Sequence, residues 1–241
     1  MTDPREIPEN NDGPILLFDI DGTLIMSGGA GARALEQAFV ELTGIERALS
    51  GVHLDGATDL AIVREALEHG GRQVTPELMD QLVSRYTALL PGELQRAEGY
   101  RLLEGVEALL EKLAAELRIF GLCTGNVREG ARAKLARGGV WEHFTRTFEG
   151  GFGSDGEVRS DIVRAALRRA ETHRGHALKP MEALVIGDTP RDVQAAHEVG
   201  VPVLAVATGR YTAAQLREAG ADLVVDSLAE PAALEIMCVT A

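Results

Sequence analysis

Cysteine is scarce in this sequence, because only Cys123 and Cys238 occur among its 241 residues. Two cysteines so far apart cannot build a disulfide framework, and they do not have the spacing of a zinc site. The chain is long enough to bury a hydrophobic core without disulfide or metal cross-links, as one large domain or two small ones. We therefore expect a protein of a reducing compartment, the cytoplasm.

The sequence also has no long apolar runs and relatively few basic residues. No apolar stretch approaches the ~20 residues that a membrane span needs. Residues 1–14 are polar and acidic and lack the basic and apolar regions of a signal peptide. The chain carries 24 Lys and Arg against 37 Asp and Glu, a net charge of −13. This charge disfavours nucleic acids and anionic membranes as partners, and nothing in the pattern specifies an oligomeric state.

Three common catalytic signatures are missing as well. The glycine-rich residues 28–31 are not followed by the Gly-Lys-Ser/Thr of a nucleotide P-loop, and they are typical of a hinge. No Gly-x-Ser-x-Gly elbow of a serine hydrolase occurs. The six histidines are scattered without zinc spacing, and Cys123 lies inside an apolar run, as expected of a core residue.

The sequence does contain short apolar runs that alternate with amphipathic helical patterns. Runs of this length, closed by Gly, Asp or Thr, predict buried strands. The predicted strands are residues 15–20, 118–123, 183–186, 201–207 and 223–225, and the predicted helices are residues 105–117, 161–170, 192–199 and 212–219. Continuous apolar strands that alternate with helices predict an α/β fold, a doubly wound parallel sheet covered on both faces.

One region breaks this alternation. Between residues 30 and 97 the periodicity is helical, and the three predicted helices are residues 34–42, 59–67 and 76–89. We therefore predict an all-helical domain at residues 28–98, inserted after the first strand of a core made of residues 1–27 and 99–241. Glycines at both ends of the insert are candidate hinges.

Polar residues follow three of the predicted strands. Asp19 and Asp21 end the first strand, Thr124 follows the second and Asp188 follows the third. Because the carboxyl ends of parallel strands line one crevice, we expect these side chains to converge. Two carboxylates side by side are costly unless a cation or a proton separates them. Mg²⁺, which prefers oxygen ligands, fits such a cluster.

These strand ends resemble the motifs of a known family. Residues 18–24 (FDIDGTL) resemble the first motif of the haloacid-dehalogenase superfamily, residues 122–126 (LCTGN) the second, and residues 185–192 (VIGDTPRD) the fourth. The helical insert resembles the cap of the phosphoglycolate-phosphatase-like branch. The resemblance implies a Rossmann-like core and a Mg²⁺-dependent phosphohydrolase that acts on a small phosphorylated metabolite through an aspartyl-phosphate.

The resemblance also implies a role for each acidic residue. Asp19 would be the nucleophile that attacks phosphorus. Asp21 would protonate the leaving group and then activate water. Mg²⁺ would be held by Asp19, the backbone carbonyl of Asp21, and Asp188. Asp192 would orient the basic group of the third motif or a metal-bound water.

Substrate contacts are expected around the second motif and in the insert. Thr124 and backbone N–H groups would hold the phosphoryl oxygens, although Thr124 could also simply cap a strand end. Residues 54–59 (LDGATD) resemble a loop that helps to choose the substrate in this branch. The Thr-Asp pair at the end of this segment is also typical of a helix N-terminus. The expected substrate-binding residues are Gly22, Thr23, Gly125, Asn126, Thr58 and Asp59.

The third motif is where the sequence departs from the family, which usually has a lysine there. The chain has three lysines. Lys112 and Lys134 fall within helices that flank the second motif, and Lys179 comes too late. Arg159 precedes Ser160 and Asp161, a good N-cap pair for the next helix, so we predict that Arg159 supplies the cation. The alternative is a surface arginine.

Four other functions compete with a phosphatase. A dehalogenase of this superfamily lacks the acid found at Asp21, and a phosphonate-cleaving relative needs a cap lysine, which residues 28–98 do not contain. A sugar-phosphate mutase of the β-phosphoglucomutase type uses the same two aspartates and stays open. A catalytically degenerate binding protein on the same fold is the non-enzyme alternative.

Overall fold

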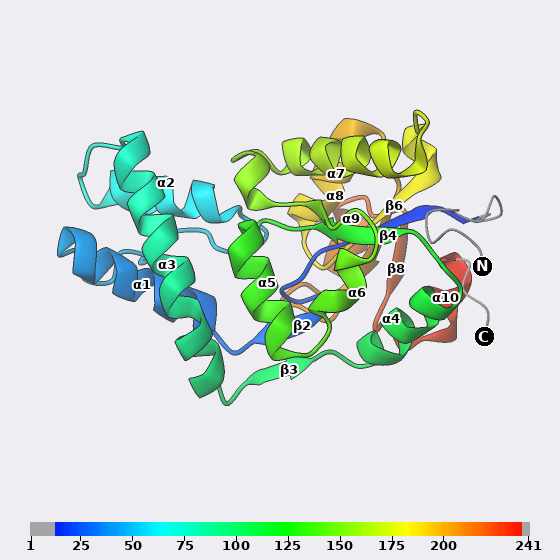
Figure 1. Cartoon of the computed structure of the whole chain (residues 1–241), viewed down its shortest axis with the longest axis horizontal. Helices are drawn as coiled ribbons and strands as arrows, with labels where there is room; N and C mark the ends of the chain where they lie inside the picture. The colour runs from blue at the N-terminus through cyan, green and yellow to red at the C-terminus, as the bar shows by residue number, and fades with distance from the viewer. Residues whose placement is uncertain (1–12, 238–241) are drawn as a thin grey trace, which may run out of the picture.

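The computed structural model describes residues 13–237, so most of the polar N-terminal segment and Cys238 lie outside the described residues. A six-stranded parallel sheet forms the centre of the molecule, and three helices form a separate layer at one end (Figure 1). The order across the sheet is β5 (Gly150–Gly151), β4 (Phe120–Cys123), β1 (Ile15–Phe18), β6 (Ala183–Gly187), β7 (Val203–Val206) and β8 (Leu223–Val225).

Strand β1 lies in the middle of the sheet because all of its side chains are apolar. Its four residues are fully buried. Successive side chains of a strand point to opposite faces, so Leu16 and Phe18 join one apolar cluster while Ile15 and Leu17 join another. The predicted doubly wound sheet is therefore confirmed, with one core on each face.

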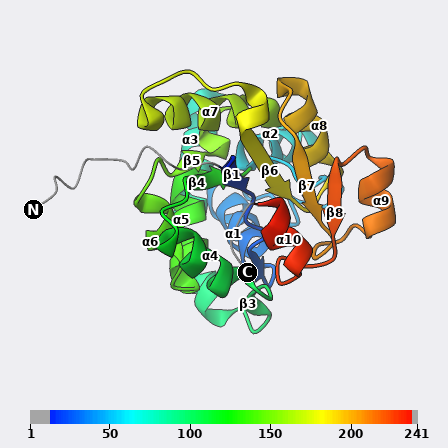
Figure 2. The same cartoon turned by 90° about the vertical axis from the view of Figure 1, so that its right-hand side faces the viewer.

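Helices cover both faces, as Figure 2 shows with the sheet between them. One face is covered by α4 (Val106–Ala115), α5 (Arg128–Arg137), α6 (Trp141–Thr145) and α10 (Pro231–Ile236). The other is covered by α7 (Arg159–Arg174) and α8 (Pro190–Val199), with α9 (Ala213–Glu218) beside β8 at the edge. Single turns of 3-10 helix occur at Gly153–Asp155 and Pro180–Glu182.

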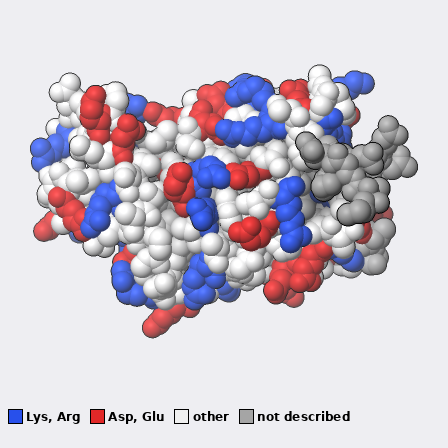
Figure 3. All heavy atoms as spheres, in the orientation of Figure 1, with Lys and Arg blue, Asp and Glu red and all other residues white. Residues whose placement is uncertain are grey.

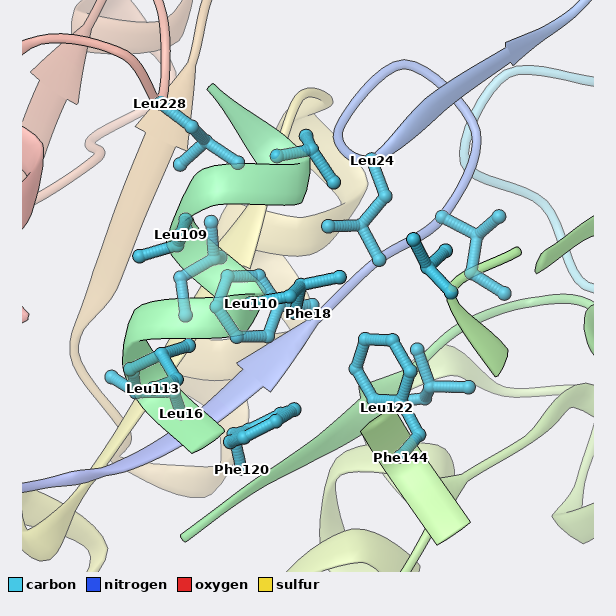
Figure 4. Packing of buried hydrophobic residues seen from close by; sticks show 14 of the residues in the cluster. Leu16, Phe18, Leu24, Leu109, Leu110, Leu113, Phe120, Leu122, Phe144 and Leu228 are labelled. Atoms are coloured by element: carbon cyan, nitrogen blue, oxygen red, sulfur yellow. The ribbon is translucent and has the colours of Figure 1, made fainter. Parts of the chain in front are cut away.

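Three phenylalanines pack together in the first of these cores. Phe18, Phe120 and Phe144 come from β1, β4 and α6, and Figure 4 shows their rings beside the leucines of α4. Each pair meets edge to face, with ring centroids 6.4, 6.5 and 5.4 Å apart. This geometry is favoured by the aromatic quadrupole, and it fixes the two strands whose ends carry polar motifs.

The helical insert consists of α1 (Ala30–Thr43), α2 (Asp59–His69), α3 (Pro76–Arg96) and the loops between them. Its helices bury an apolar cluster of their own, in which Phe39, Leu67 and Leu82 are fully enclosed. The two predicted N-caps form, since Thr58 accepts from the amide of Ala61 and Thr75 accepts from that of Leu78. The predicted all-helical insert on a parallel α/β core is confirmed.

A short hairpin joins the insert to the sheet. Strands β2 (Ile25–Ser27) and β3 (Tyr100–Leu102) pair antiparallel on the two connecting segments. Gly28 has a φ of +60°, and a Cβ there would lie 2.9 Å from the carbonyl carbon of Gly99, so only glycine allows the two segments to run this close. The sequence did not predict this hairpin, because each strand has only three residues.

Helix α7 begins earlier than the sequence predicted. It starts at Arg159, after Val158, and no side chain caps it. The predicted N-cap pair, Ser160 and Asp161, lies inside the first turn instead. Strand β5 and helices α6 and α10 were also not predicted, since each has six residues or fewer and carries little periodicity. Only tertiary packing specifies elements this short.

Charge of both signs is spread over the face shown in Figure 3, where basic side chains lie among acidic ones. Within residues 13–237, no helix is long and apolar enough to cross a bilayer.

Candidate active site at the carboxyl edge of the sheet

The candidate site lies where three neighbouring strands end. Strand β1 pairs with β4 on one side and with β6 on the other. Asp19, Thr124 and Asp188 are the first residues after these strands, and all three are at most 4% exposed. The structure thus brings together side chains that are up to 169 positions apart in the sequence, as the parallel arrangement requires.

Three buried carboxylates gather at this edge. Asp19, Asp188 and Asp192 each place an oxygen within 4.8 Å of the others, and we call this group the acidic cluster. Burial, together with the nearby carboxylates of Asp192 and Asp19, raises the pKa of Asp188 to about 9. Burial also raises the pKa of Asp19 to about 6, against the opposing effect of Arg159. The cluster carries more negative charge than its surroundings balance.

Two small residues allow the backbone to come close to this cluster. Gly22 has a φ of +84°, and a Cβ on it would lie 2.2 Å from an oxygen of Asp188. Its own N–H donates to the carbonyl of Ile25, 2.8 Å away. The hydroxyl of the buried Thr23 donates to Asp188 at 3.3 Å. Gly22 and Thr23 therefore shape the wall around Asp188.

The donor set suits a divalent cation. The three groups offer only carboxylate oxygens, the ligands that Mg²⁺ prefers, and they are buried rather than solvated. A raised pKa of the kind found at Asp188 marks a carboxylate that lacks enough positive charge nearby. A dication beside Asp19 and Asp188 would supply that charge.

Arg159 supplies the fixed positive charge of the site. It is the first residue of α7, is 9% exposed, and places Nη2 3.1 Å from the carboxylate of Asp19. Its Nε donates to Asp192 at 2.8 Å, and Nη1 donates to the carbonyl of Gly56 in the helical insert at 3.1 Å. Arg159 is therefore not the surface arginine that the sequence left open as the alternative.

Both oxygens of Asp192 are already engaged. Oδ1 accepts from Arg159, and Oδ2 accepts from the amide and the hydroxyl of Thr189 at 3.0 and 2.7 Å. Asp192 lies in the first turn of α8, whose N-cap is Thr189. Of the two roles predicted for Asp192, these contacts favour orientation of the basic group over orientation of a metal-bound water.

A second polar group surrounds Asp21, which is not one of the three residues of the acidic cluster. Asn126 donates to Asp21 at 2.9 Å, and the ammonium of Lys134 donates at 2.6 Å. Lys134 also donates to the side-chain oxygen of Asn126. Asp59 of the insert contributes a further carboxylate, and we call these four residues the lysine cluster. Burial alone would raise the pKa of Asp21, but Lys134 lowers it below the ordinary value.

Thr124 contacts the lysine cluster through Asn126. Its side chain is fully buried, and its Oγ1 accepts from the side-chain amide of Asn126 at 2.8 Å and from its backbone amide at 3.3 Å. Because those bonds use its lone pairs, the hydroxyl hydrogen of Thr124 remains available for a further hydrogen bond. Its backbone amide donates to Gly151 of β5 at 3.2 Å, which fixes the strand end.

Lys134 is the site residue that the sequence placed in a helix and set aside. It lies on α5 and is 5% exposed, with Ala131 and Leu135 of the same helix also buried. The spacing from Val127 through Ala131 to Lys134 is that of one helix face. A lysine on the buried stripe of a helix that follows the second motif was the available signal, because an unpaired lysine is rarely buried.

The loop before α2 reaches the site from the helical insert. The amide of Asp59 donates to the carbonyl of Gly125, and its carboxylate accepts from the amide of Val127, both at 2.8 Å. Thr58 donates to the backbone carbonyl of Glu157 at 3.0 Å. A Cβ on Gly125 would lie 2.3 Å from the carbonyl of Ala57, so the loop and the strand end touch backbone to backbone.

A cavity of about 590 Å³ lies between the sheet edge and the helical insert. Asp19, Asp21, Asp188 and Arg159 line its floor, and the insert supplies most of its opposite wall. Of the predicted site residues, Thr23, Thr58, Thr124 and Asp192 do not line the cavity. Thr23, Thr124 and Asp192 contact the lining side chains of Asp188, Asn126 and Arg159, respectively.

Comparison with known proteins places these features in a family context. A model of the haloacid dehalogenase-like hydrolases matches residues 14–200. The chain is similar to a probable phosphatase, IndB, of Dickeya dadantii, with 25% identity over 90% of this chain and 91% of that protein. It is similar to a phosphoglycolate phosphatase of Rhodospirillum rubrum, with 28% identity over 89% of this chain and 87% of that protein.

Solved structures give the same picture for the fold. The crystal structure of CbbY from Rhodobacter sphaeroides in complex with phosphate superimposes with a TM-score of 0.71 at 21% identity, over 90% of this chain and 96% of that one. A hydrolase from Pseudomonas syringae superimposes with a TM-score of 0.69 at 22% identity, over 94% and 100%. The architecture is therefore shared well beyond the matched motifs.

Proposed function

The chain belongs to the haloacid dehalogenase-like hydrolases, and we propose that it is a Mg²⁺-dependent phosphatase that cleaves a small phosphate monoester through an aspartyl-phosphate on Asp19. The observation that carries the proposal is the acidic cluster beside Arg159, a buried site with excess negative charge and one fixed cation. The phosphatases among its relatives support the reaction class.

Asp19, Asp188 and the backbone carbonyl of Asp21 would hold the metal. When bound, Mg²⁺ supplies charge that offsets the repulsion between the Asp19 carboxylate and the substrate phosphate. Asp192 keeps Arg159 in place through its Oδ1 atom, and Thr189 keeps Asp192 in place through Oδ2. The cluster is thus organised before substrate arrives, which is what electrostatic stabilisation of a transition state requires.

In the first half-reaction an oxygen of Asp19 attacks phosphorus, and the bond between phosphorus and the leaving oxygen breaks. Asp21 gives its proton to that oxygen, so an alcohol leaves and an acyl phosphate remains on Asp19. Lys134 lowers the pKa of Asp21 in the free protein. A phosphate that enters beside Asp21 brings negative charge, which acts in the opposite direction and favours the protonated acid.

In the second half-reaction a water molecule attacks the phosphorus of the acyl phosphate. Asp21, now a carboxylate, takes the proton of that water, the bond between Asp19 and phosphorus breaks, and inorganic phosphate leaves. Lys134 and Asn126 hold the same oxygen of Asp21, so they fix the direction in which the base can reach water.

The phosphoryl oxygens would be held by Thr124, by Arg159 and by backbone amides of the first and second motifs. Arg159 already lies 3.1 Å from Asp19, on a side of the carboxylate that α7 provides. The amide of Gly125 follows Thr124, whose hydroxyl hydrogen is still available, whereas the amide of Asn126 already donates to Thr124. The amides of Gly22 and Thr23 already donate to the carbonyls of Ile25 and Ile20, so these two amides are not free donors in that loop.

Trapping of the intermediate tests this proposal. The protein is mixed with p-nitrophenyl phosphate and Mg²⁺, quenched in acid within milliseconds and reduced with borohydride, which converts an aspartyl-phosphate to homoserine. We expect this conversion at Asp19, its loss in the Asp19→Asn variant, and no turnover in EDTA. Phosphate release with no modification of Asp19, or with modification of another residue, would contradict the proposal.

The mutase and the binding protein remain as alternatives with distinct outcomes. A mutase would convert a hexose 1-phosphate to the 6-phosphate with little free phosphate, which ³¹P NMR resolves. A degenerate binding protein would bind a phosphate ester and leave it intact. Inorganic phosphate that appears in step with the alcohol supports the phosphatase.

A further inference from the structure

The leaving group of the substrate must lie in the part of the cavity away from the acidic cluster. There the wall comes from the helical insert and is largely apolar: its side chains include Leu35, Leu49, Leu54, Ile62 and Tyr86. Met26 of β2 adds a sixth apolar side chain. Apolar walls favour ligands that have apolar surface to bury.

The helical insert offers the cavity no positive charge. The cavity-lining residues that it contributes within the described chain include Asp55 and Asp59 but neither lysine nor arginine. Two of its arginines form ion pairs with residues that do not line the cavity: Arg33 with Glu93 at 2.8 Å, and Arg64 with Glu157 at 2.6 Å.

The lysine cluster does not change this balance. Lys134 lines the cavity, but it lies against the carboxylate of Asp21 and in the field of Asp59. One ammonium therefore faces two carboxylates in this part of the cavity. A carboxylate brought into the same space would meet net negative charge at low dielectric, which costs binding free energy.

Two further arginines line the cavity, and because both are exposed to solvent we call them the mouth arginines. Arg101 on β3 is exposed. The side chain of Arg210 is 80% exposed and pairs with Asp55 at 3.1 Å. Cations that are this well solvated contribute little to binding, so they do not create a carboxylate site beside the phosphoester.

We propose that the leaving group of the physiological substrate is uncharged and apolar next to the phosphoester, larger than two carbons, and not a short carboxylate such as glycolate. This inference rests on the proposed phosphatase function and assigns the substrate class of the same site. A cavity of about 590 Å³ far exceeds the space that a phosphate with a two-carbon acid fills.

Three esters with leaving alcohols of comparable basicity test the inference: benzyl phosphate, isobutyl phosphate and 2-phosphoglycolate. The isobutyl group has nearly the shape of the carboxymethyl group but no charge, so this pair isolates the effect of charge. We expect kcat/KM for isobutyl phosphate to exceed that for 2-phosphoglycolate at least ~10-fold, and benzyl phosphate to gain roughly another 10-fold from added apolar surface.

A substitution in the wall sharpens the test. Leu54 is partly buried, lines the cavity and takes no part in the chemistry. Leu54→Lys should raise the ratio of kcat/KM for 2-phosphoglycolate to that for isobutyl phosphate about 10-fold, because it adds a cation to the apolar wall. Leu54→Gln, which removes the apolar surface without adding charge, is the matched control and should leave that ratio nearly unchanged.

The outcomes separate the inference from the function on which it rests. Equal or better turnover of 2-phosphoglycolate, with the other esters also hydrolysed, overturns the inference and leaves the phosphatase intact. If Arg101→Gln or Arg210→Gln then removes that turnover, the mouth arginines bind the carboxylate. Failure to hydrolyse any of the three esters or p-nitrophenyl phosphate overturns the proposed function and the inference with it.

Discussion

Two largely buried polar groups lie side by side at the edge of the sheet, and their negative charges are balanced in different ways. In the acidic cluster, three carboxylates share the single cation of Arg159, and the pKa of Asp188 rises to about 9 because of burial and like charge. In the lysine cluster, Asp21 has both Lys134 and the amide of Asn126, and its pKa falls instead.

The difference shows how one strand end can carry two carboxylates with separate roles. Asp19 and Asp21 are two residues apart, yet one faces a group that needs a further cation and the other faces a lysine. Environments that push the pKa values of neighbouring acids apart are typical of acid and base assignments in enzymes. The following predictions test whether each cluster has the balance described here.

The largest effect is expected from Asp188→Asn. Loss of a carboxylate from the proposed metal site should lower kcat/KM roughly 10³-fold or more, since metal-based charge stabilisation contributes several kcal/mol. Metal-free Asp188→Asn should melt a few degrees higher than the parent, because a carboxyl whose pKa is raised by folding costs free energy of folding above its ordinary pKa, and the substitution removes that cost. Mg²⁺ should raise the Tm of the parent but not of the variant.

The control for this experiment is Asp161→Asn, which removes an exposed carboxylate of α7 that pairs with Arg164. Activity and the Mg²⁺-dependent rise in Tm should both survive in it. A normal rise in Tm with Mg²⁺ in Asp188→Asn would show that the metal binds elsewhere.

Arg159→Ala should lower kcat/KM by about 10²–10³-fold, the cost of removing one preorganised charge from a site of this kind. Because Arg159 is buried against Asp19 and Asp192, the variant should also lose stability, by about 3–5 kcal/mol as for a broken buried pair. Steady-state kinetics and thermal melts measure the two effects separately.

Arg159→Lys should restore part of the activity, although an ammonium cannot donate to Asp19, Asp192 and Gly56 as the guanidinium does. Arg164→Ala, on the exposed side of the same helix, should behave like the parent. Full activity in Arg159→Ala would remove this arginine from the mechanism.

Lys134→Met keeps the length of the side chain and deletes its charge. We expect kcat to fall roughly 10-fold to 100-fold, a part of what general acid and base catalysis contributes, because Asp21 loses the partner that orients it. The KM should change little. Lys179→Met, which changes an exposed lysine, is the matched control. An unchanged kcat in Lys134→Met would show that Lys134 has only a structural role.

The smallest effect is expected at the contact between insert and core. Arg64 of α2 pairs with Glu157 of the core through two hydrogen bonds of 2.6 Å. Arg64→Ala should raise KM about 3-fold with little change in Tm, because an exposed ion pair holds the loop near the site only weakly. Arg85→Ala breaks a pair of similar exposure inside the insert and should leave KM unchanged.

The polar residues at the strand ends could be predicted from the sequence because each motif is local. An apolar run followed by Asp19-x-Asp21 or by Gly-Asp188 predicts both the strand and the polar residue after it, and the structure has each of them there. Parallel strands bring such ends together whatever their separation along the chain. The position of Arg159 was predicted from its loop, while the start of its helix was placed two residues late.

The role of Lys134 and the apolar wall of the cavity could not be predicted from local sequence motifs. A lysine in a helix is usually solvated, and only the docking of α5 against the sheet and α3 places this one beside Asp21. Likewise, the sequence pattern alone predicts that Leu54 and Ile62 belong to an ordinary helical core. That they also line the cavity depends on how the insert closes over the strand ends.

The sequence by itself determined the parallel α/β core, the helical insert and the acidic residues at the strand ends, because strand length, periodicity and adjacent motifs are properties of short segments. Only the tertiary structure decided which cation each carboxylate faces, since Arg159 and Lys134 reach their partners from helices packed on opposite faces of the sheet. Charge balance in a buried site depends on distances through space, and those distances follow from how the helices pack rather than from the order of residues.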